Sequence, residues 1–426
     1  MRTKRRTRRA TTPLLLLIGL VAMSPRSARA VLCTVDNVPA ATLLLPYFEV
    51  DLSTAATRST LMSITNASAQ ATLAHVVLWT DWAVPTLAFD VYLTGYDVQT
   101  MNLRDVLEGN LPVTADRARD PDDAISPEGP LSQDSTFPGC AGLLPPPPLS
   151  TIDLATLQRA HQGLSQAVPG GLCSGQFFGD GLLRGYVTVD AVTRCSQLFP
   201  GAPGYFGPGG VASYANVLVG DFFYLGSQGP SAAGFNLVRI EADPVRFGPG
   251  SRTFYSSLVR GSGADGREPL PAVWATRYFN GGAFVGETDV IVWREDPAPG
   301  QYVACGSSPP STFPMGQAAI VALDEQEHAV TIPAACNPNP CQPPPPAGEA
   351  FPFPLAANHL RIGADNPNFT LPFAAGWLLL NLDRSPDQLD SQAWVGVVLG
   401  SDGGFQLGFD GTPLLGGCAV HPPKPF

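Results

Sequence analysis

Lysine is almost absent from this 426-residue chain, which holds only Lys4 and Lys424. Arginine therefore carries nearly all of the positive charge, in a chain with much alanine, glycine and proline. Such usage is typical of a GC-rich genome and favours a bacterial source. Charged residues make up only 14% of the chain and hydrophobic residues 44%. Intrinsic disorder needs few hydrophobic residues and a high net charge, so we expect the bulk of the chain to fold.

Sequence signatures of common catalytic sites are also missing. There is no G-x-S-x-G, H-E-x-x-H or P-loop motif and no G-x-G-x-x-G on a strand-to-helix turn, which leaves serine hydrolase, zincin, nucleotide and dinucleotide chemistry without support. The five histidines lie far apart in the sequence. His75 sits inside an apolar strand pattern, which favours a hydrogen-bonded core histidine over a catalytic one. The chain is therefore more consistent with a protein that is not an enzyme.

A long hydrophobic run is missing as well, because no stretch of about 18 apolar residues occurs, and we expect no transmembrane segment. The chain does begin with arginine-rich residues 1–9, an apolar run over residues 14–23, and Ser27-Ala-Arg-Ala30. This order predicts a secretory signal peptide over residues 1–30. The protein is therefore expected to be secreted, into the periplasm, to the cell surface or into the medium.

The charge balance excludes one class of partner. The net charge is −11, and the expected signal peptide contains basic residues and no acid, so its removal would make the chain still more acidic. Binding of nucleic acid needs concentrated lysine and arginine, and we do not expect it. The partners that we consider are a surface glycan or another copy of the chain.

Cysteine is sparse, but its number is even. In an exported protein, eight cysteines most simply predict four disulfide bonds. Local spacing favours a bond between Cys336 and Cys341 and, more weakly, one between Cys173 and Cys195. A metal site is the competing interpretation, but the chain has no C-x-x-C motif and no histidine at zinc-like spacing. The eight disulfide candidates are Cys33, Cys140, Cys173, Cys195, Cys305, Cys336, Cys341 and Cys418; among them, Cys33 and Cys418 are candidates to tie the termini together.

Strand patterns dominate the chain. Apolar residues alternate with others over residues 87–94, and residues 73–80 are apolar on both faces, as in a central strand. Glycine and proline, 44 of each, punctuate nearly every gap between such segments. We therefore predict an all-β protein, an antiparallel β-sandwich of two packed units with long loops and one short helix. Further strands are expected over residues 60–65, 98–103, 183–192, 217–225, 235–241, 273–279, 289–294, 318–323, 377–382, 393–399 and 404–409.

The one expected helix runs over residues 152–166, after Ser150-Thr151 as a cap. Two proline-rich segments divide the remaining strands into three expected units. The predicted order is a signal peptide over 1–30, an N-terminal β unit over 31–115, an acidic and proline-rich excursion with the helix over 116–171, a central β unit over 172–333, a proline-rich linker over 334–354, and C-terminal strands over 355–426. The last group is short for a separate sandwich and is a candidate to complete a sheet begun earlier in the chain.

Acidic residues offer two kinds of site. Asp383, Asp387 and Asp390 can approach one another if the chain turns there, and a second acidic loop spans residues 116–128. Calcium binds where several hard oxygens converge, so structural Ca²⁺ is the one metal we consider, against the simpler interpretation of solvated loop charges; otherwise we expect no cofactor. A pair of strand-borne carboxylates would suit a glycosidase, although nothing in the spacing selects a pair. The strand-borne candidates are Asp90, Asp190, Asp221, Glu241, Glu287 and Asp289.

Aromatic residues are concentrated over residues 79–96. Trp79, Trp82, Tyr92 and Tyr96 can bind a sugar ring or a partner protein if they are exposed, and they fill the sandwich core if they are buried. Core filling is the simpler expectation. Together these features favour a secreted, non-catalytic surface, matrix or envelope protein. The alternatives are a carbohydrate- or protein-binding β-sandwich module and a glycan-active hydrolase with paired carboxylates.

Overall fold

The computed structural model describes residues 38–53, 58–167, 170–226, 232–259, 265–282, 285–307, 320–332, 353–362, 371–383, 391–401 and 405–415. Several of the sequence-based expectations fall outside these ranges. They are the signal peptide over residues 1–30, nearly all of the 334–354 linker, and the residues Cys33, Cys336, Cys341, Asp387, Asp390 and Cys418.

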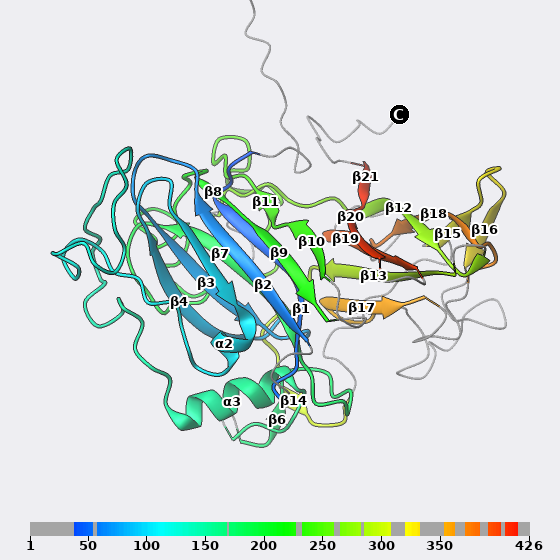
Figure 1. The fold of residues 1–426 in the computed structure, drawn as a ribbon, viewed down its shortest axis with the longest axis horizontal. Coiled ribbons are helices and arrows are strands. Elements are labelled where there is room, and N and C mark those ends of the chain that lie inside the picture. The colour runs from blue at the N-terminus through cyan, green and yellow to red at the C-terminus, as the bar shows by residue number, and fades with distance from the viewer. Residues whose placement is uncertain are drawn as a thin grey trace, which may run out of the picture.

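The described chain is an all-β sandwich protein, as predicted, with antiparallel sheets and short helices (Figure 1). We call its N-terminal part the first sandwich. One of its sheets has the strand order β11-β1-β7-β3-β4 and the other β10-β9-β2-β5, with β8 also paired to β2. The strands are β1 (Thr42–Val50), β2 (Ser59–Asn66), β3 (Thr72–Trp79), β4 (Pro85–Leu93), β5 (Val98–Asn102), β7 (Leu183–Val192), β8 (Leu218–Val219), β9 (Asp221–Leu225), β10 (Ala232–Asn236) and β11 (Val238–Ile240).

The C-terminal part forms the second sandwich, whose sheets have the orders β16-β15-β18-β12-β21 and β17-β13-β19-β20. A two-stranded sheet of β6 (Leu172–Cys173) and β14 (Val303–Ala304) joins segments from the two parts of the chain. The remaining strands are β12 (Val273–Phe279), β13 (Gly286–Arg294), β15 (Ile320–Leu323), β16 (Ala329–Ile332), β17 (Ala357–Arg361), β18 (Ala375–Asn381), β19 (Ala393–Ser401), β20 (Phe405–Asp410) and β21 (Thr412–Leu415).

The described residues contain two helices where the sequence predicted one. The expected helix is α3 (Thr151–His161), which begins at the cap Ser150, where the side chain accepts a hydrogen bond from the Asp153 N–H, and ends five residues earlier than expected. The sequence analysis missed α2 (Leu103–Leu107), whose first residue had been assigned to a strand. The Asn102 side chain caps α2 by accepting from the Arg104 N–H, so the chain turns directly from strand to helix.

Strand β1 was also absent from the expected strands, although it lies inside the sheet, between β11 and β7. Its sequence contains Pro46, and proline is unfavourable in a central strand because it cannot donate a ladder hydrogen bond. The structure accommodates Pro46 with an irregularity in register between Leu45 and Phe48 opposite β7. This bulge sets the positions of Tyr47 and Glu49, which line the cleft described below.

Strand pairing crosses the boundaries that the sequence suggested for three units. β7, from the expected central unit, lies between β1 and β3, and β9 pairs with β2. In the second sandwich, β12 and β13 pair with the C-terminal strands β18, β21, β17 and β19. The short C-terminal group therefore completes sheets that begin earlier in the chain. Among the described residues, no helix is long and apolar enough to cross a membrane.

Two disulfide bonds lie within the described ranges, and every cysteine there is bonded. Cys140 pairs with Cys195, and Cys173 pairs with Cys305. The expected Cys173–Cys195 bond is therefore wrong. Sequence proximity suggested it, but pairing of β6 with β14 brings Cys173 to Val303 and so to Cys305, 132 residues away. This bond connects the last residue of β6 to the residue that follows β14.

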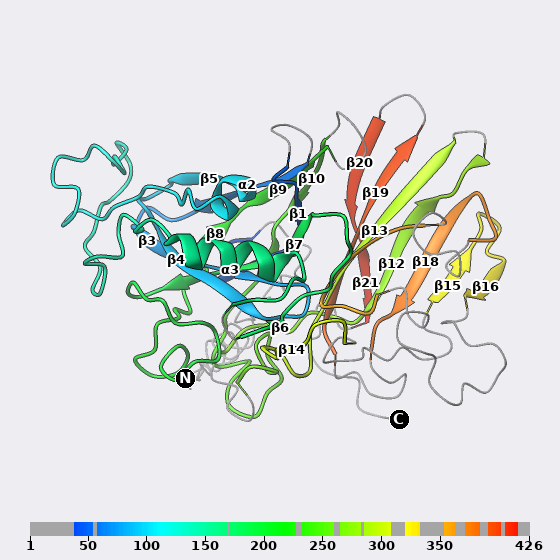
Figure 2. The same ribbon diagram turned by 90° about the horizontal axis from the view of Figure 1, so that it is seen from below.

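The two sandwiches lie against each other (Figure 2). One continuous hydrophobic core includes residues of both. β1 contacts β13 and β17 of the second sandwich, and the edge strands β10 and β20 lie side by side. The edge strands meet at glycines: a Cβ atom on Gly408 would stand only 2.7 Å from the Gly234 carbonyl oxygen. Close approach of the backbones at this point leaves no room for a side chain.

Candidate functional site between the two sandwiches

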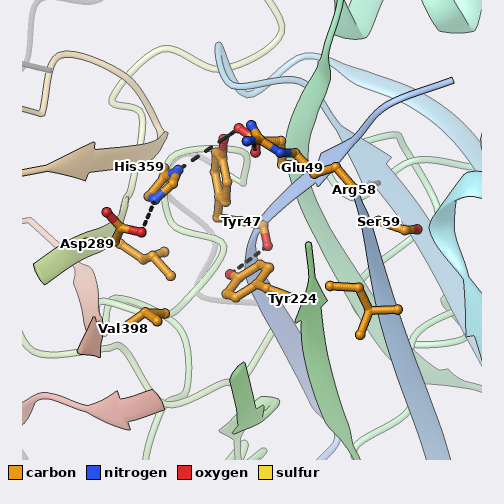
Figure 3. Close-up of a pocket in the computed structure, with 10 residues that line it drawn as sticks. Tyr47, Glu49, Arg58, Ser59, Tyr224, Asp289, His359 and Val398 are labelled. Atoms are coloured by element: carbon orange, nitrogen blue, oxygen red, sulfur yellow. Dashed lines mark hydrogen bonds and ion pairs between the residues drawn. The ribbon is translucent and has the colours of Figure 1, made fainter. Parts of the chain in front are cut away.

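A small cleft lies where β1 and β9 of the first sandwich face β13, β17 and β19 of the second (Figure 3). Tyr47, Glu49 and Tyr224 line it from one side, and Asp289 and His359 line it from the other. The Tyr224 hydroxyl donates a hydrogen bond to the Tyr47 carbonyl oxygen at 2.9 Å. Enclosed space in the cleft is enough for about one water molecule.

Glu49 is the carboxylate of the first sandwich that lines the cleft, and it is only 5% exposed. Its carboxylate accepts hydrogen bonds from Arg58 Nη1 at 2.6 Å, from Arg184 Nε at 3.2 Å and from the Tyr47 hydroxyl at 2.8 Å. Antiparallel register places Glu49 directly opposite Arg184 on β7. Burial opposes ionisation, but the charges of His359, Arg184 and Arg58 outweigh it, so the pKa of Glu49 lies below its usual value.

Asp289 is the corresponding carboxylate on the second sandwich and is 1% exposed. It lies opposite Arg361 in the β13–β17 pair, and Arg361 Nε donates to it at 3.0 Å. His359 Nε2 lies 3.4 Å from the same carboxylate. Burial would raise the pKa of Asp289, but His359 and Arg361 together hold it at about 2.

His359 stands between the two carboxylates (Figure 3). Its Nδ1 is 4.0 Å from Glu49 Oε2, its Nε2 faces Asp289, and its ring packs on Tyr47 with centroids 5.5 Å apart. A general acid needs a raised pKa, whereas both of these carboxylates have lowered ones. The arrangement is suited to hold the two sandwiches together through one imidazole, and it is poorly suited to donate a proton to a substrate.

We expect His359→Ala to lower the free energy of unfolding by about 1–3 kcal/mol, because two buried carboxylates would lose the group between them. His328→Ala is the matched control. His328 also contacts a carboxylate, Asp324, at 2.8 Å, but its side chain is 73% exposed, and we expect a loss of no more than about 0.5 kcal/mol. Urea unfolding of both variants measures the difference, and equal losses would contradict the role given to His359.

The aromatic candidates divide into three buried residues and one exposed residue. Trp79, Trp82 and Tyr92 are 1%, 4% and 0% exposed, and Tyr96 is 56% exposed in a turn. Trp79 stacks on Tyr186 at 5.7 Å. Tyr92 belongs to a small core around the Cys140–Cys195 bond, and Trp82 packs near Cys173. These four residues therefore form no exposed platform.

The acidic loop over residues 116–128 uses its carboxylates within the chain. Asp116 accepts from Arg119 and the Phe137 N–H, and Asp120 accepts the N–H groups of residues 124, 125 and 126. Asp383 is buried and accepts the Ser391 N–H. In the described ranges, no group of three or more metal-ligating side chains is arranged to hold a metal ion.

The strand-borne carboxylates proposed for a glycosidase are mostly separated. Asp90 is bound by His75 and the Ser196 N–H, which confirms His75 as a core histidine. Asp190 is buried among Thr42, Tyr205, Tyr255 and Arg267. Asp221 is exposed at the start of β9. Asp289 alone lines the cleft, and its counterpart there is Glu49, which the sequence analysis did not select.

No sequence signal related the cleft residues to one another. Glu49 and His359 are 310 positions apart, and each lies in a strand that the sequence analysis did not predict. The Leu45–Phe48 bulge and the pairing of β13 with β17 bring them together.

Two other buried acids make stability depend on pH. Burial raises the pKa of both Asp81 and Glu268 to about 7. The folded state therefore holds protons that the unfolded state has released, and stability rises as the pH falls from 8 toward 5. Burial lowers the pKa of His161 to about 4, which opposes part of this gain below pH 6.5. We expect a net gain of about 1–3 kcal/mol between pH 8 and pH 5.

Urea unfolding at several pH values measures this gain, and Asp81→Asn should flatten the profile because it removes one of the titrations that raise stability as the pH falls. Stability that falls steadily from pH 8 to pH 5 would contradict the raised pKa values of Asp81 and Glu268.

Comparison of the chain with protein-family models, curated proteins and solved structures gave no match.

Proposed function

We propose that this protein is an exported, non-catalytic component of a cell surface, matrix or envelope, in which a rigid pair of β-sandwiches presents its loops and outer faces to other molecules. The observation that supports the proposal most directly is the state of the cleft between the sandwiches. Its two carboxylates, Glu49 and Asp289, are each held by arginine and share His359, with lowered pKa values. The cleft thus joins the sandwiches and lacks the free acid that hydrolysis needs.

Export is supported by two features of different kinds. The first is the order of basic, apolar and small residues over residues 1–30, which is typical of a secretory signal. The second is the pair of disulfide bonds, Cys140–Cys195 and Cys173–Cys305, because such bonds form and persist in oxidising compartments. A bacterial source fits the near absence of lysine.

Sedimentation velocity on residues 31–426, first with calcium and then with a chelator, tests the structural part of this proposal. Assembly into large particles, whether or not it depends on calcium, supports a role as a structural surface component. In parallel, the same preparation is assayed against a panel of glycans. A monomer that releases sugars, with activity lost in Glu49→Gln and Asp289→Asn, would overturn the proposal and favour the hydrolase alternative.

A further inference from the structure

The two disulfide bonds of the described ranges differ in their exposure. Cys140 and Cys195 are 0% and 6% exposed, and both belong to one small apolar core. Cys173 is also buried, at 2%, but its partner Cys305 is exposed, in the turn that follows β14. The Cys305 sulfur lies 3.4 Å from the Gly171 carbonyl oxygen, in an exposed contact. A thiol in solution therefore reaches the second bond at one end and the first bond at neither.

The Cys173–Cys305 bond fastens a sheet that is too short to persist by itself. β6 and β14 have two residues each, and their register pairs Cys173 with Val303 and Leu172 with Ala304. An isolated pair of strands is marginal in water even when the strands are longer. The disulfide bond joins the end of β6 to the residue after β14, and so supplies the connection that the short ladder lacks.

This short sheet covers an apolar cluster that includes residues of both sandwiches. Trp82 and Val84, from the turn between β3 and β4, are buried there with Leu355, which precedes β17. Tyr302 and Val303 are half-buried and pack against the same cluster. Movement of β14 away from β6 would carry Tyr302 and Val303 with it and would leave Trp82 less covered.

We propose that the Cys173–Cys305 bond is a site of thiol–disulfide exchange, at which a dithiol opens the β6–β14 sheet while the Cys140–Cys195 bond stays closed. A thiolate of the dithiol forms a new S–S bond with the exposed Cys305 sulfur. The old S–S bond breaks, and its electron pair leaves with the Cys173 sulfur, which then takes a proton.

The second thiolate of the dithiol completes the reaction. It attacks the sulfur that the dithiol has bound to Cys305, so the mixed disulfide breaks and Cys305 leaves as a thiolate, which also takes a proton. The dithiol ends as an intramolecular disulfide, oxidised by two electrons, and the protein bond is reduced by the same two electrons. Exposed disulfide bonds are in general the labile ones, which agrees with the choice of this bond.

Neighbouring contacts limit how far the opening would spread. The Gly300 N–H donates a hydrogen bond to the Ala83 carbonyl oxygen at 3.0 Å, and the Ala356 N–H donates to the Asp81 carbonyl oxygen at 2.9 Å. The large hydrophobic core that includes residues of both sandwiches does not contain the disulfide bond. We therefore expect residues 301–307 and β6 to separate while the two sandwiches stay joined.

This inference goes beyond the proposed surface role and stands independently of it, because the exchange needs only this fold and a dithiol. The folded, disulfide-bonded protein is treated with dithiothreitol for increasing times and then alkylated. Peptide mass spectrometry measures the alkylation of each cysteine separately. We expect Cys173 and Cys305 to be alkylated together, at least about tenfold faster than Cys140 and Cys195, because the buried bond must wait for the fold to open.

Hydrogen exchange measures what the opened bond releases. After selective reduction we expect faster exchange over residues 172–173 and 302–307 and no change over residues 183–192 of β7. Acrylamide should quench tryptophan fluorescence more strongly, and Trp82→Phe should remove this increase. The double variant Cys173→Ser, Cys305→Ser should reproduce both changes without reductant, and Cys140→Ser, Cys195→Ser is its matched control. If a double variant fails to fold, the reduced natural chain still gives both measurements.

Three results would overturn the proposal. The first is alkylation of all four cysteines at one rate, and the second is alkylation of Cys140 and Cys195 before the other pair. The third is selective reduction of Cys173–Cys305 without faster exchange over residues 302–307, because the bond would then not hold the short sheet. None of these outcomes bears on export or assembly, so failure here is distinguishable from failure of the proposed function.

Discussion

Arg267→Met is expected to cost about 3–5 kcal/mol of unfolding free energy, which is the largest effect of a single substitution that we predict. Arg267 is fully buried and contacts Thr42 of β1 and Asp190 of β7. Its guanidinium donates to the carbonyl oxygens of Asp265 and Ser213 at 2.7 and 3.1 Å, and it lies 3.3 Å from Asp190. Removing it would leave a buried carboxylate without its countercharge and two carbonyl groups without donors.

The contacts of the Asp190 carboxylate explain why Arg267→Met would affect more than one ion pair. Tyr205 and Tyr255 donate to it at 2.7 and 2.9 Å, and Thr42 donates to the other oxygen. These hydrogen bonds tie the loops that carry Tyr205 and Tyr255 to the sheet. We therefore expect Arg267→Met to loosen both loops as well.

Arg277→Met is the control for this prediction. Arg277 forms an ion pair with Glu325 at 2.8 Å, but the two side chains are 45% and 54% exposed. Water screens such a pair, so we expect a change of no more than about 0.5 kcal/mol. Urea unfolding of both variants gives the comparison, and losses within about 1 kcal/mol of each other would show that the buried network does not carry the stability assigned to it.

Gly185→Ala should cost about 3 kcal/mol, the second largest effect. A Cβ atom at this position would stand 2.0 Å from the Trp79 carbonyl oxygen and 3.1 Å from the Phe48 ring. The carbonyl belongs to the neighbouring strand β3 and cannot move without breaking its pairing with β7. Because Gly185 lies opposite Phe48, just past the bulge, the displacement would also move Arg184 away from Glu49.

Gly170→Ala is the matched control, because nothing lies within 4 Å of its Cβ direction and its φ angle is not positive. It should leave stability unchanged or slightly higher. Hydrogen exchange should show faster opening of β1 and β7 in Gly185→Ala and no change in Gly170→Ala. If Gly185→Ala is as stable as the control, the close packing of β7 on β3 is not as described.

The fold class could be predicted because strand periodicity is a local property. The alternation over residues 87–94 and the apolar run over residues 73–80 correspond to β4 and β3. Residues 183–192 and 273–279 were predicted with the boundaries of β7 and β12. Local pattern failed where tertiary structure overrides it, as at β1, where a bulge accommodates Pro46, and at α2, whose five residues are too few to show a helical period.

Which strands pair, and therefore which residues share a site, could not be read from the sequence. Cys173 was matched to the nearer Cys195, but its partner is Cys305, because β6 pairs with β14. Three of the four aromatic candidates are buried, as expected, but Tyr96 is exposed. No sequence pattern indicated that Glu49 and His359 share a site. They come together through the packing of the two sandwiches, which no local motif encodes.

The most direct test of the central claim, that this is an exported surface protein, uses its shortage of lysine. Residues 1–426 are produced in a bacterium, and intact cells are treated with an amine reagent that does not cross membranes. After cleavage at Ala30, the amines left in the chain are the new N-terminus at Val31 and Lys424. Mass spectrometry of the fractionated cells and medium then reports processing, exposure and disulfide formation together.

The account predicts a chain that begins at Val31, is labelled at that residue on the cell surface or found in the medium, and has no free thiol. An unlabelled chain that remains in the cytoplasm, retains residues 1–30 and carries reduced cysteines would contradict it.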